Sequence, residues 1–373
     1  MNKVLLSSHN TWSIYNFRLN LIKRLLDSGK EVHIYSVIDD YSKYLINIGC
    51  TVHKSGFEAR SKNVFKEIFA LIHWITFLKK NKFDICLHFG IKPNIYGSIA
   101  SIINSVPYVN NVTGLGDIFI KKNMLQFFVK SLYVLTQRKA KKVFFQNEDD
   151  LKIFIDSKII LNNSNYDLLP GSGVDLKRFK QKDYSLNNNN KISFYFVGRL
   201  LKSKGVDLFI NAAKKIIREN KFTNIEFCIV GFFEKNASND SISEDFLNDS
   251  TNKDFIKYLG KSDFMENTLL KADCVVLPSS YREGIPRTLL ESCAVGVPII
   301  TTNSVGCKNV IEDKLNGFMI EPNNVDDLKS SIEKFASLTY EDRTKMGVNA
   351  RKKAELEFDE RIVINKYMEI FND

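Results

Sequence analysis

One stretch decides the fold of this chain, Glu283-Gly284-Ile285-Pro286-Arg287-Thr288-Leu289-Leu290-Glu291, which sets two carboxylates eight residues apart around the start of a helix. Pro286 suits the first helical position, where a missing N–H costs nothing, so Gly284 and Ile285 lie where backbone amides point outward. A helix N-terminus attracts anions, and glutamates accept hydrogen bonds from hydroxyls. The stretch therefore predicts a ligand with phosphates between two polyhydroxyl ends, such as a nucleotide sugar.

A second motif lies about 80 residues upstream, Phe194-Tyr195-Phe196-Val197-Gly198-Arg199-Leu200-Leu201-Lys202-Ser203-Lys204-Gly205. Its aromatic and β-branched run predicts a strand, and the residues after it predict a turn and a helix that begins near Gly205. Arg199 and Lys204 lie at this turn, where both can bind phosphate.

Together the two motifs resemble those of the family 4 glycosyltransferases of GT-B fold, in which Gly-Arg-x5-Gly precedes Glu-x7-Glu. The resemblance implies that Arg199 and Lys204 neutralise the diphosphate of the donor. It implies that Glu283 and the amides after it meet the donor sugar, and that Glu291 meets the ribose. The implied catalytic residues are Arg199, Lys204 and Glu283, and the implied donor-binding residues are Gly198, Gly284, Ile285, Pro286, Arg287 and Glu291.

Simpler interpretations of these residues stay open. Arg199 and Lys204 fit a solvated charged turn, and Glu283 fits a residue that compensates the helix dipole, worth under about 1 kcal/mol at an exposed site. Glu291 is the strongest candidate, because it lies inside a mostly apolar helix, where ionised side chains are seldom unpaired.

Length and composition indicate two globular domains. The chain has 373 residues, more than one hydrophobic core normally fills, with 44% apolar and 26% charged residues. Its six cysteines form no CxxC pair and have no histidine at ligand spacing, which argues against a zinc site. Cys86, Cys228 and Cys274 lie in apolar runs and are expected to be buried thiols, as in a reducing cytoplasm. The N-terminus has no signal-peptide pattern, and no apolar run reaches 18 residues.

Short strands and helices alternate along the chain, which predicts an α/β protein with doubly wound parallel sheets. With the resemblance, the expected fold is GT-B: two Rossmann-like domains that face a central cleft, with the ligand beyond the carboxyl ends of the strands. The expected domains are 1–175 for the acceptor, joined by a C-terminal helix at 358–373, a linker at 176–190, and 191–357 for the donor. The expected strands are Val4–Ser7, Val32–Ser36, Asp84–Leu87, Tyr108–Asn110, Val143–Gln146, Tyr166–Leu169, Ile192–Val197, Glu226–Val230, Cys274–Leu277 and Pro298–Thr301.

The net charge of +10 is confined to the first half. Residues 1–185 hold 27 Lys and Arg against 15 Asp and Glu, whereas the remainder holds 26 against 28. The excess gathers around two segments with basic ends and many aromatics, 62–80 and 121–142. Such helices suit the surface of an anionic bilayer, where each cation adds about 1 kcal/mol, and they also suit ordinary covering helices of an α/β domain. The two interpretations are compatible.

The loop after the first strand, residues 8–18, lacks the Gly-x-Gly-x-x-Gly of dinucleotide sites, which disfavours a nicotinamide enzyme. It resembles the corresponding loop of bacterial family 4 enzymes that extend polyprenyl-diphosphate-linked sugars at the cytoplasmic face of the inner membrane, as do the segments 92–94 and 113–116. The implied acceptor-binding residues are His9, Asn10, Arg18, Lys92, Asn94, Thr113, Gly114 and Gly116. Many family members carry a histidine in the loop after the strand at 84–87. His88 fits that role or that of a satisfied loop histidine, and the resemblance leaves part of the role open to Lys92. His9 is open in the same way, and Arg18 fits either an acceptor-phosphate ligand or a plain surface residue.

The implied reaction transfers a sugar from a nucleoside diphosphate to a hydroxyl with retention of configuration. UDP-GalNAc or UDP-GlcNAc is the first expectation for the donor. Cations and a helix N-terminus stabilise the charge of the departing diphosphate. No metal or other cofactor is expected, and the chain has no Asp-x-Asp triplet.

Other functions remain open at this stage. A sugar-nucleotide epimerase uses a similar fold and donor site, and a transferase for another soluble or lipid acceptor has the same motifs. A nucleic-acid module fits the basic charge, but the cations flank apolar helices and no aromatic RNA-binding signature is present, so no nucleic-acid partner is expected. A non-enzymatic scaffold leaves the charged motifs without a purpose.

Overall fold

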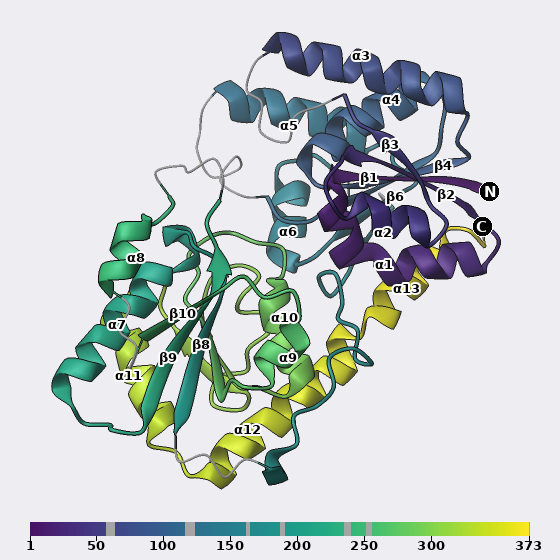
Figure 1. The fold of residues 1–373 in the computed structure, drawn as a ribbon. Coiled ribbons are helices and arrows are strands. Elements are labelled where there is room, and N and C mark those ends of the chain that lie inside the picture. Colours follow the sequence, from purple (N-terminus) through teal and green to yellow (C-terminus); the bar gives the residue numbers. More distant parts are fainter. Residues whose placement is uncertain are drawn as a thin grey trace. The chain divides into compact units, whose positions relative to one another are not determined.

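The computed structural model describes residues 1–56, 64–115, 124–161, 165–186, 191–234, 240–250 and 256–372. The chain divides into two α/β units, drawn in Figure 1. The first unit comprises Met1–Ser172 and Arg361–Asp373, and the second comprises Gly173–Glu360.

The first unit is built on a seven-stranded parallel sheet of order β3-β2-β1-β4-β5-β6-β7. Its strands are β1 (Lys3–Asn10), β2 (Glu31–Val37), β3 (Thr51–Lys54), β4 (Ile85–Phe89), β5 (Tyr108–Val112), β6 (Lys142–Phe145) and β7 (Tyr166–Leu168). Its helices are α1 (Thr11–Asp27), α2 (Ser42–Asn47), α3 (Val64–Asn81), α4 (Ser98–Ile103), α5 (Met124–Gln137), α6 (Glu148–Asp156) and α13 (Glu360–Glu369), with a π-helical turn at Pro93–Gly97. The central strand β4 is buried at every residue, as expected for a parallel strand covered on both faces.

Alternate residues of β1 reach the two faces of this sheet. Val4 and Leu6 pack in one cluster with residues of α1 and α13, whereas Leu5 packs on the other face with Trp74 of α3. Figure 1 shows the C-terminal helix α13 beside the N-terminal helix α1, and α3 and α4 together at the other side of the sheet. The last helix of the chain thus completes the core of the first unit.

The second unit has a six-stranded parallel sheet of order β10-β9-β8-β11-β12-β13. The strands are β8 (Ile192–Arg199), β9 (Ile225–Phe232), β10 (Ile256–Gly260), β11 (Cys274–Leu277), β12 (Ile299–Thr302) and β13 (Gly317–Ile320). The helices are α7 (Val206–Glu219), α8 (Glu244–Ser250), α9 (Met265–Leu269), α10 (Arg287–Val295), α11 (Val325–Ala336) and α12 (Tyr340–Lys353), with short turns at Tyr184–Leu186, Lys202–Lys204 and Ala354–Phe358. Helices α7 and α11 pack on one another, and α9 packs on α10 (Figure 1).

All ten strands expected from the sequence are present, and both sheets are parallel as predicted. The sequence missed β3, β10 and β13. All three lie at an edge of a sheet, and of the four edge strands only β7 was predicted. An edge strand is covered less completely than a central one, so its sequence lacks the continuous apolar run that marks a buried parallel strand.

Residues 176–190 were expected to be a linker. The described part of this segment, through Leu186, instead packs on the second unit. Phe179 is fully buried in the core of the second unit, and the amide of Lys182 donates to the carbonyl of Val295 at 2.7 Å. One buried aromatic among polar residues anchors this segment, which the sequence pattern did not reveal. The chain returns beside it, because Val174 pairs with Asp359 in a parallel bridge.

Among the described residues, no helix combines the length and the apolar character needed to cross a bilayer. All six cysteines are buried free thiols, as expected for Cys86, Cys228 and Cys274.

Candidate functional site

The candidate donor site lies at the carboxyl ends of the second sheet. Gly198 and Arg199 are the last two residues of β8, next to Gly231 and Phe232 of β9. The guanidinium of Arg199 forms an ion pair with Glu234 at 3.1 Å, just beyond the end of β9. Glu234 belongs to neither sequence motif and was not among the predicted site residues.

The turn after β8 places Lys204 two residues before the start of α7. Gly205 follows with a φ of +79°, and a Cβ there would lie 2.3 Å from the carbonyl oxygen of Pro278. Only glycine combines this left-handed conformation with so close an approach of another backbone segment. The turn is thereby packed against the segment that follows β11.

Hydrogen bonds fasten the same two segments together. The Ser203 carbonyl accepts from the amides of Ser280 and Tyr281, at 3.0 and 3.2 Å. The Ser279 hydroxyl lies 3.1 Å from this carbonyl, and the carbonyl of Ser279 accepts from the Ser304 hydroxyl at 3.0 Å. The backbone around Lys204 and the loop that leads to Glu283 therefore form one fixed frame.

Within this frame Lys204 and Glu283 form an ion pair. Their side chains are only 11% and 16% exposed, and the Ser279 hydroxyl lies 3.2 Å from the same Glu283 oxygen. The ammonium group also lies 5.9 Å from the centre of the Tyr281 ring. Two residues predicted from separate motifs are thus brought into direct contact.

The helix after Glu283 begins one residue later than expected. Pro286 is the N-cap of α10, with an extended ψ of 121°, and the helix starts at Arg287. Gly284 is buried, and Gly306 packs closely against it: with a φ of +88°, a Cβ on Gly306 would lie 2.2 Å from the Gly284 carbonyl oxygen. Ile285 is half-buried. The elements keep the expected order: Glu283 and its loop come first, and the free amides of the first turn of α10 follow.

One turn further along α10, Arg287 donates to Glu291 at 2.7 Å. Burial raises the pKa of the Glu291 carboxyl, while Arg287 and the more distant Arg178 act in the opposite direction. Arg178 itself forms an ion pair with Glu266 of α9 at 2.8 Å. Glu291 is therefore a paired residue in a nearly buried position, and Arg178 and Glu266 are neighbours that the sequence did not reveal.

The residues expected to bind the acceptor lie at the carboxyl ends of the first sheet. The side chain of Asn10 caps α1 by accepting from the amide of Ser13 at 3.0 Å. His9 packs on Gly90 beyond β4, where a Cβ would lie 2.7 Å from its ring nitrogen Nε2. Arg18 is 5% exposed and lies 4.6 Å from the centre of the Phe89 ring, so it is not a plain surface residue.

The segment after β4 is fixed to α3 and to β5. Lys92 forms an ion pair with Glu67 of α3 at 2.7 Å, and both side chains are 17% exposed. Asn94 is buried and donates to the Asn111 carbonyl at 2.8 Å. Farther along, Thr113 is exposed, Gly114 is half-buried, and Gly116 lies outside the described residues.

His88 belongs to β4 and not to the loop after it. It is completely buried, with Nδ1 2.7 Å from the Ser7 hydroxyl and Nε2 3.4 Å from the Ser101 hydroxyl. Burial lowers the pKa of His88 to about 3, so the ring is neutral at neutral pH. Of the two roles left open for His88, the structure supports the satisfied core histidine.

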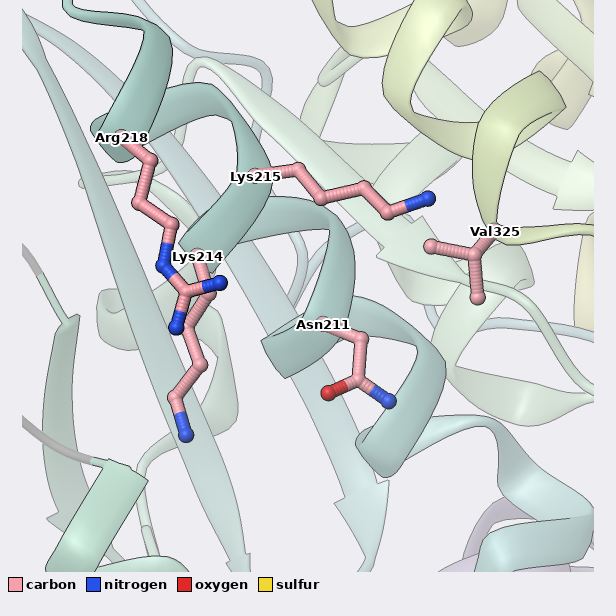
Figure 2. Close-up of a pocket in the computed structure, with 5 residues that line it drawn as sticks. All are labelled: Asn211, Lys214, Lys215, Arg218 and Val325. Carbon is pink, nitrogen blue, oxygen red and sulfur yellow. The ribbon is translucent and has the colours of Figure 1, made fainter.

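Two further observations concern metal binding and a hollow away from the predicted site residues. The described part of the chain contains no group of three or more His, Cys, Asp or Glu side chains that could hold a metal ion. A hollow of about 390 Å³ lies on α7, lined by Asn211, Lys214, Lys215, Arg218 and Val325 (Figure 2). Figure 2 shows Lys215 extending toward Val325; Lys215 is paired with Asp326, and Lys214 donates to Ser250 at 2.9 Å.

The two parallel α/β units define the class of protein, and comparison with known proteins agrees. Residues 177–353 match the family described as "Glycosyl transferases group 1", and residues 3–147 match "Glycosyl transferase 4-like". The chain belongs to these glycosyltransferases of GT-B fold.

Two relatives carry specific names. The chain is 30% identical to the N,N'-diacetylbacillosaminyl-diphospho-undecaprenol alpha-1,3-N-acetylgalactosaminyltransferase of Campylobacter jejuni, over 98% of this chain and 97% of that protein. It is 28% identical to the UDP-Gal:alpha-D-GlcNAc-diphosphoundecaprenol alpha-1,3-galactosyltransferase of Escherichia coli, over 73% and 71% of the two chains.

Solved structures show the same fold at low identity. The sucrose-phosphate synthase of Thermosynechococcus elongatus has a TM-score of 0.80 at 14% identity, covering 100% of this chain and 98% of that one. Anabaena HepE in complex with UDP has a TM-score of 0.80 at 16% identity, with full coverage of both chains.

Proposed function

We propose that this glycosyltransferase moves a sugar, an N-acetylhexosamine such as GalNAc, from a UDP-sugar to a polyprenyl-diphosphate-linked saccharide. The observation that carries the proposal is the contact between Lys204 and Glu283, which joins the phosphate-binding turn to the helix-start motif. The two named relatives support the acceptor class, because both names specify a diphospho-undecaprenol acceptor.

The donor site has a distinct role for each group. Arg199, Lys204 and the first amides of α10 neutralise the diphosphate, and Glu291 accepts hydrogen bonds from the ribose hydroxyls. Glu283 contacts the donor sugar, with Gly198, Gly284, Ile285, Pro286 and Arg287 shaping the pocket. The cations stabilise the charge that grows on the leaving group, so the reaction proceeds without a metal or other cofactor.

The transfer retains configuration by attack from the face of the leaving group. The acceptor oxygen forms a bond to the anomeric carbon while the bond from that carbon to the β-phosphate oxygen breaks. The acceptor proton passes to the departing phosphate oxygen, so no carboxylate of the chain acts as a nucleophile.

The outer face of α3 supports a lipid-linked acceptor. Glu67, Ala70, Trp74 and Leu78 form the inner face of this helix, and the last three of them are buried. Yet the opposite face also carries large apolar side chains, Phe65, Ile68, Phe69 and Ile72, each 50–75% exposed. A helix that is apolar on all sides is normally enclosed, and an exposed one indicates a binding partner or a membrane.

Helix α5 repeats this feature with Phe127 and Phe128, which are 76% and 61% exposed. Exposed cations accompany both helices, Lys66, Lys79 and Lys80 on α3 and Arg138 and Lys139 after α5. Apolar side chains flanked by cations fit the surface of an anionic bilayer. We therefore place the enzyme at the cytoplasmic face of the inner membrane, bound through its first unit.

The acceptor residues remain predictions of the same proposal. His9, Arg18, Lys92 and Thr113 lie at the carboxyl ends of the first sheet, where a saccharide or its diphosphate would be met. Asn10 and Asn94 contribute indirectly, because their side chains form hydrogen bonds that hold the backbone of this region in place.

The experiment is a panel of UDP-sugars screened for thermal stabilisation, followed by transfer to lipid-linked saccharides of different first sugars. We expect stabilisation by UDP and by one UDP-N-acetylhexosamine, and transfer only to a polyprenyl-diphosphate acceptor. Conversion of the donor without any acceptor would instead indicate an epimerase, and failure of every UDP-sugar to bind would refute the donor assignment.

A further inference from the structure

Both cations of the donor turn are paired with a carboxylate of the chain itself. Lys204 is paired with Glu283, and Arg199 is paired with Glu234. We propose that Glu283 and Glu234 are displaceable counter-ions: the diphosphate of the donor takes their place on the cations, and they set how tightly the nucleotide is held. The inference rests on the proposed donor site and adds Glu234 to it.

Charge balance gives the first reason for displacement. The four side chains carry two positive and two negative charges, so as paired they offer no net positive charge. A diphosphate brings further negative charge, and its neutralisation requires the cations to turn from the carboxylates to the phosphate oxygens. Phosphate is a strong competitor, because charge-assisted hydrogen bonds to its several oxygens replace one bond to a carboxylate.

The backbone frame gives the second reason. Hydrogen bonds to the Ser203 carbonyl hold the two segments in place, so the exchange needs only side-chain rotation. The Ser279 hydroxyl, 3.2 Å from the Glu283 oxygen, supports the carboxylate in the paired position. On this fixed backbone the Lys204 ammonium group has two alternative partners, Glu283 and the donor phosphate. The side chains therefore have two discrete arrangements.

The exchange affects both the binding of the donor and the release of UDP. A carboxylate released from Lys204 is free to accept a hydroxyl of the donor sugar, so phosphate binding and sugar recognition are coupled. After transfer, UDP offers no sugar hydroxyl to Glu283. The carboxylate then competes again for Lys204 and favours release of UDP.

The inference predicts a gain of binding, which simple damage to a site does not produce. In Glu234→Gln and in Glu283→Gln the competing charge is removed, and UDP should bind about three- to tenfold more tightly in each by calorimetry. Uridine carries no phosphate, so its affinity should stay at the wild-type value. Turnover should fall in Glu283→Gln, because the sugar contact is lost as well.

Glu226→Gln is the matched control. Glu226 lies at the other end of β9, is 19% exposed against 18% for Glu234, and is paired with Lys257 at 2.7 Å. Its substitution should leave UDP affinity unchanged.

Unchanged or weaker UDP binding in both site variants, with melting temperatures like that of the wild type, would overturn the inference. An equal change for uridine and UDP would also overturn it, because it would show a structural effect on the whole pocket. The proposed function is tested separately by the binding of UDP to the wild type, which these outcomes leave intact.

Discussion

The carboxyl ends of the two parallel sheets carry different kinds of side chain. In the second unit, charged side chains from three separate segments meet there in ion pairs, Lys204 with Glu283 and Arg199 with Glu234. In the first unit, the polar groups are largely part of the framework, as with Asn10, which caps α1, and the buried His88. The contrast agrees with the proposed donor site, in which charged groups meet the diphosphate, whereas polar side chains of the first unit hold its backbone in place and its outer surface carries apolar side chains.

The largest expected effect concerns the electrostatic side. Arg199→Ala combined with Lys204→Ala should lower kcat/KM by about 10³-fold or more, because the leaving diphosphate loses both cations. The measurement is steady-state transfer from the UDP-sugar that stabilises the wild type.

Lys257→Ala serves as the control, since Lys257 is 38% exposed and ion-paired in the same unit, much like Arg199 at 36%. Wild-type turnover in the double variant would show that the turn is only a solvated charged loop.

A smaller effect is expected at the ribose. Glu291→Ala should weaken UDP binding by roughly 30-fold, in keeping with the loss of hydrogen bonds to a charged group. Calorimetry with UDP and with inorganic diphosphate separates the roles, because the diphosphate has no ribose and should bind both proteins equally. Equal UDP affinity in the variant and the wild type would remove the assignment.

The buried His88 of the first unit predicts a pH effect on stability. The pKa of His88 is lowered by burial to about 3, so on acidification the unfolded chain binds a proton near pH 6.5 that the folded chain does not. From pH 6.5 to 5 the wild type should lose roughly 1.5 kcal/mol of unfolding free energy relative to His88→Gln. Denaturant titrations at both pH values give this difference. Parallel pH profiles of the two proteins would show that His88 is exposed or charged.

The apolar surface predicts the smallest effect. Phe69→Ser should weaken binding to anionic lipid vesicles by roughly tenfold, because one exposed aromatic no longer enters the interface. Leu356→Ser is the control, since Leu356 is 67% exposed against 71% for Phe69 but lies in the second unit. A similar loss in the two variants, measured by vesicle sedimentation, would contradict membrane binding through α3.

Burial explains which elements could be predicted from the sequence. Continuous apolar runs predict the central strands, and all ten expected strands are present, including the edge strand β7; the other edge strands, β3, β10 and β13, lack that signal. Phe179 shows the same limit, because one buried aromatic in a polar segment does not distinguish packed chain from linker.

The charged motifs gave the candidate donor residues but not their partners. Lys204 and Glu283 were each predicted from local sequence, while their contact depends on the backbone bonds between the segments of Ser203 and Ser279. Glu234 and Glu266 belong to no motif, so only the folded chain could reveal them. His88 was expected in a loop because the predicted strand ended at Leu87. The observed strand β4 continues to Phe89, so His88 lies within it.

The central claim, that Arg199 and Lys204 hold the donor diphosphate, is tested most directly by a crystal structure of the protein with UDP. The account predicts diphosphate oxygens within hydrogen-bond distance of both cations, the ribose against Glu291, and Glu283 turned away from Lys204. UDP bound elsewhere, with Lys204 still paired to Glu283, would contradict it.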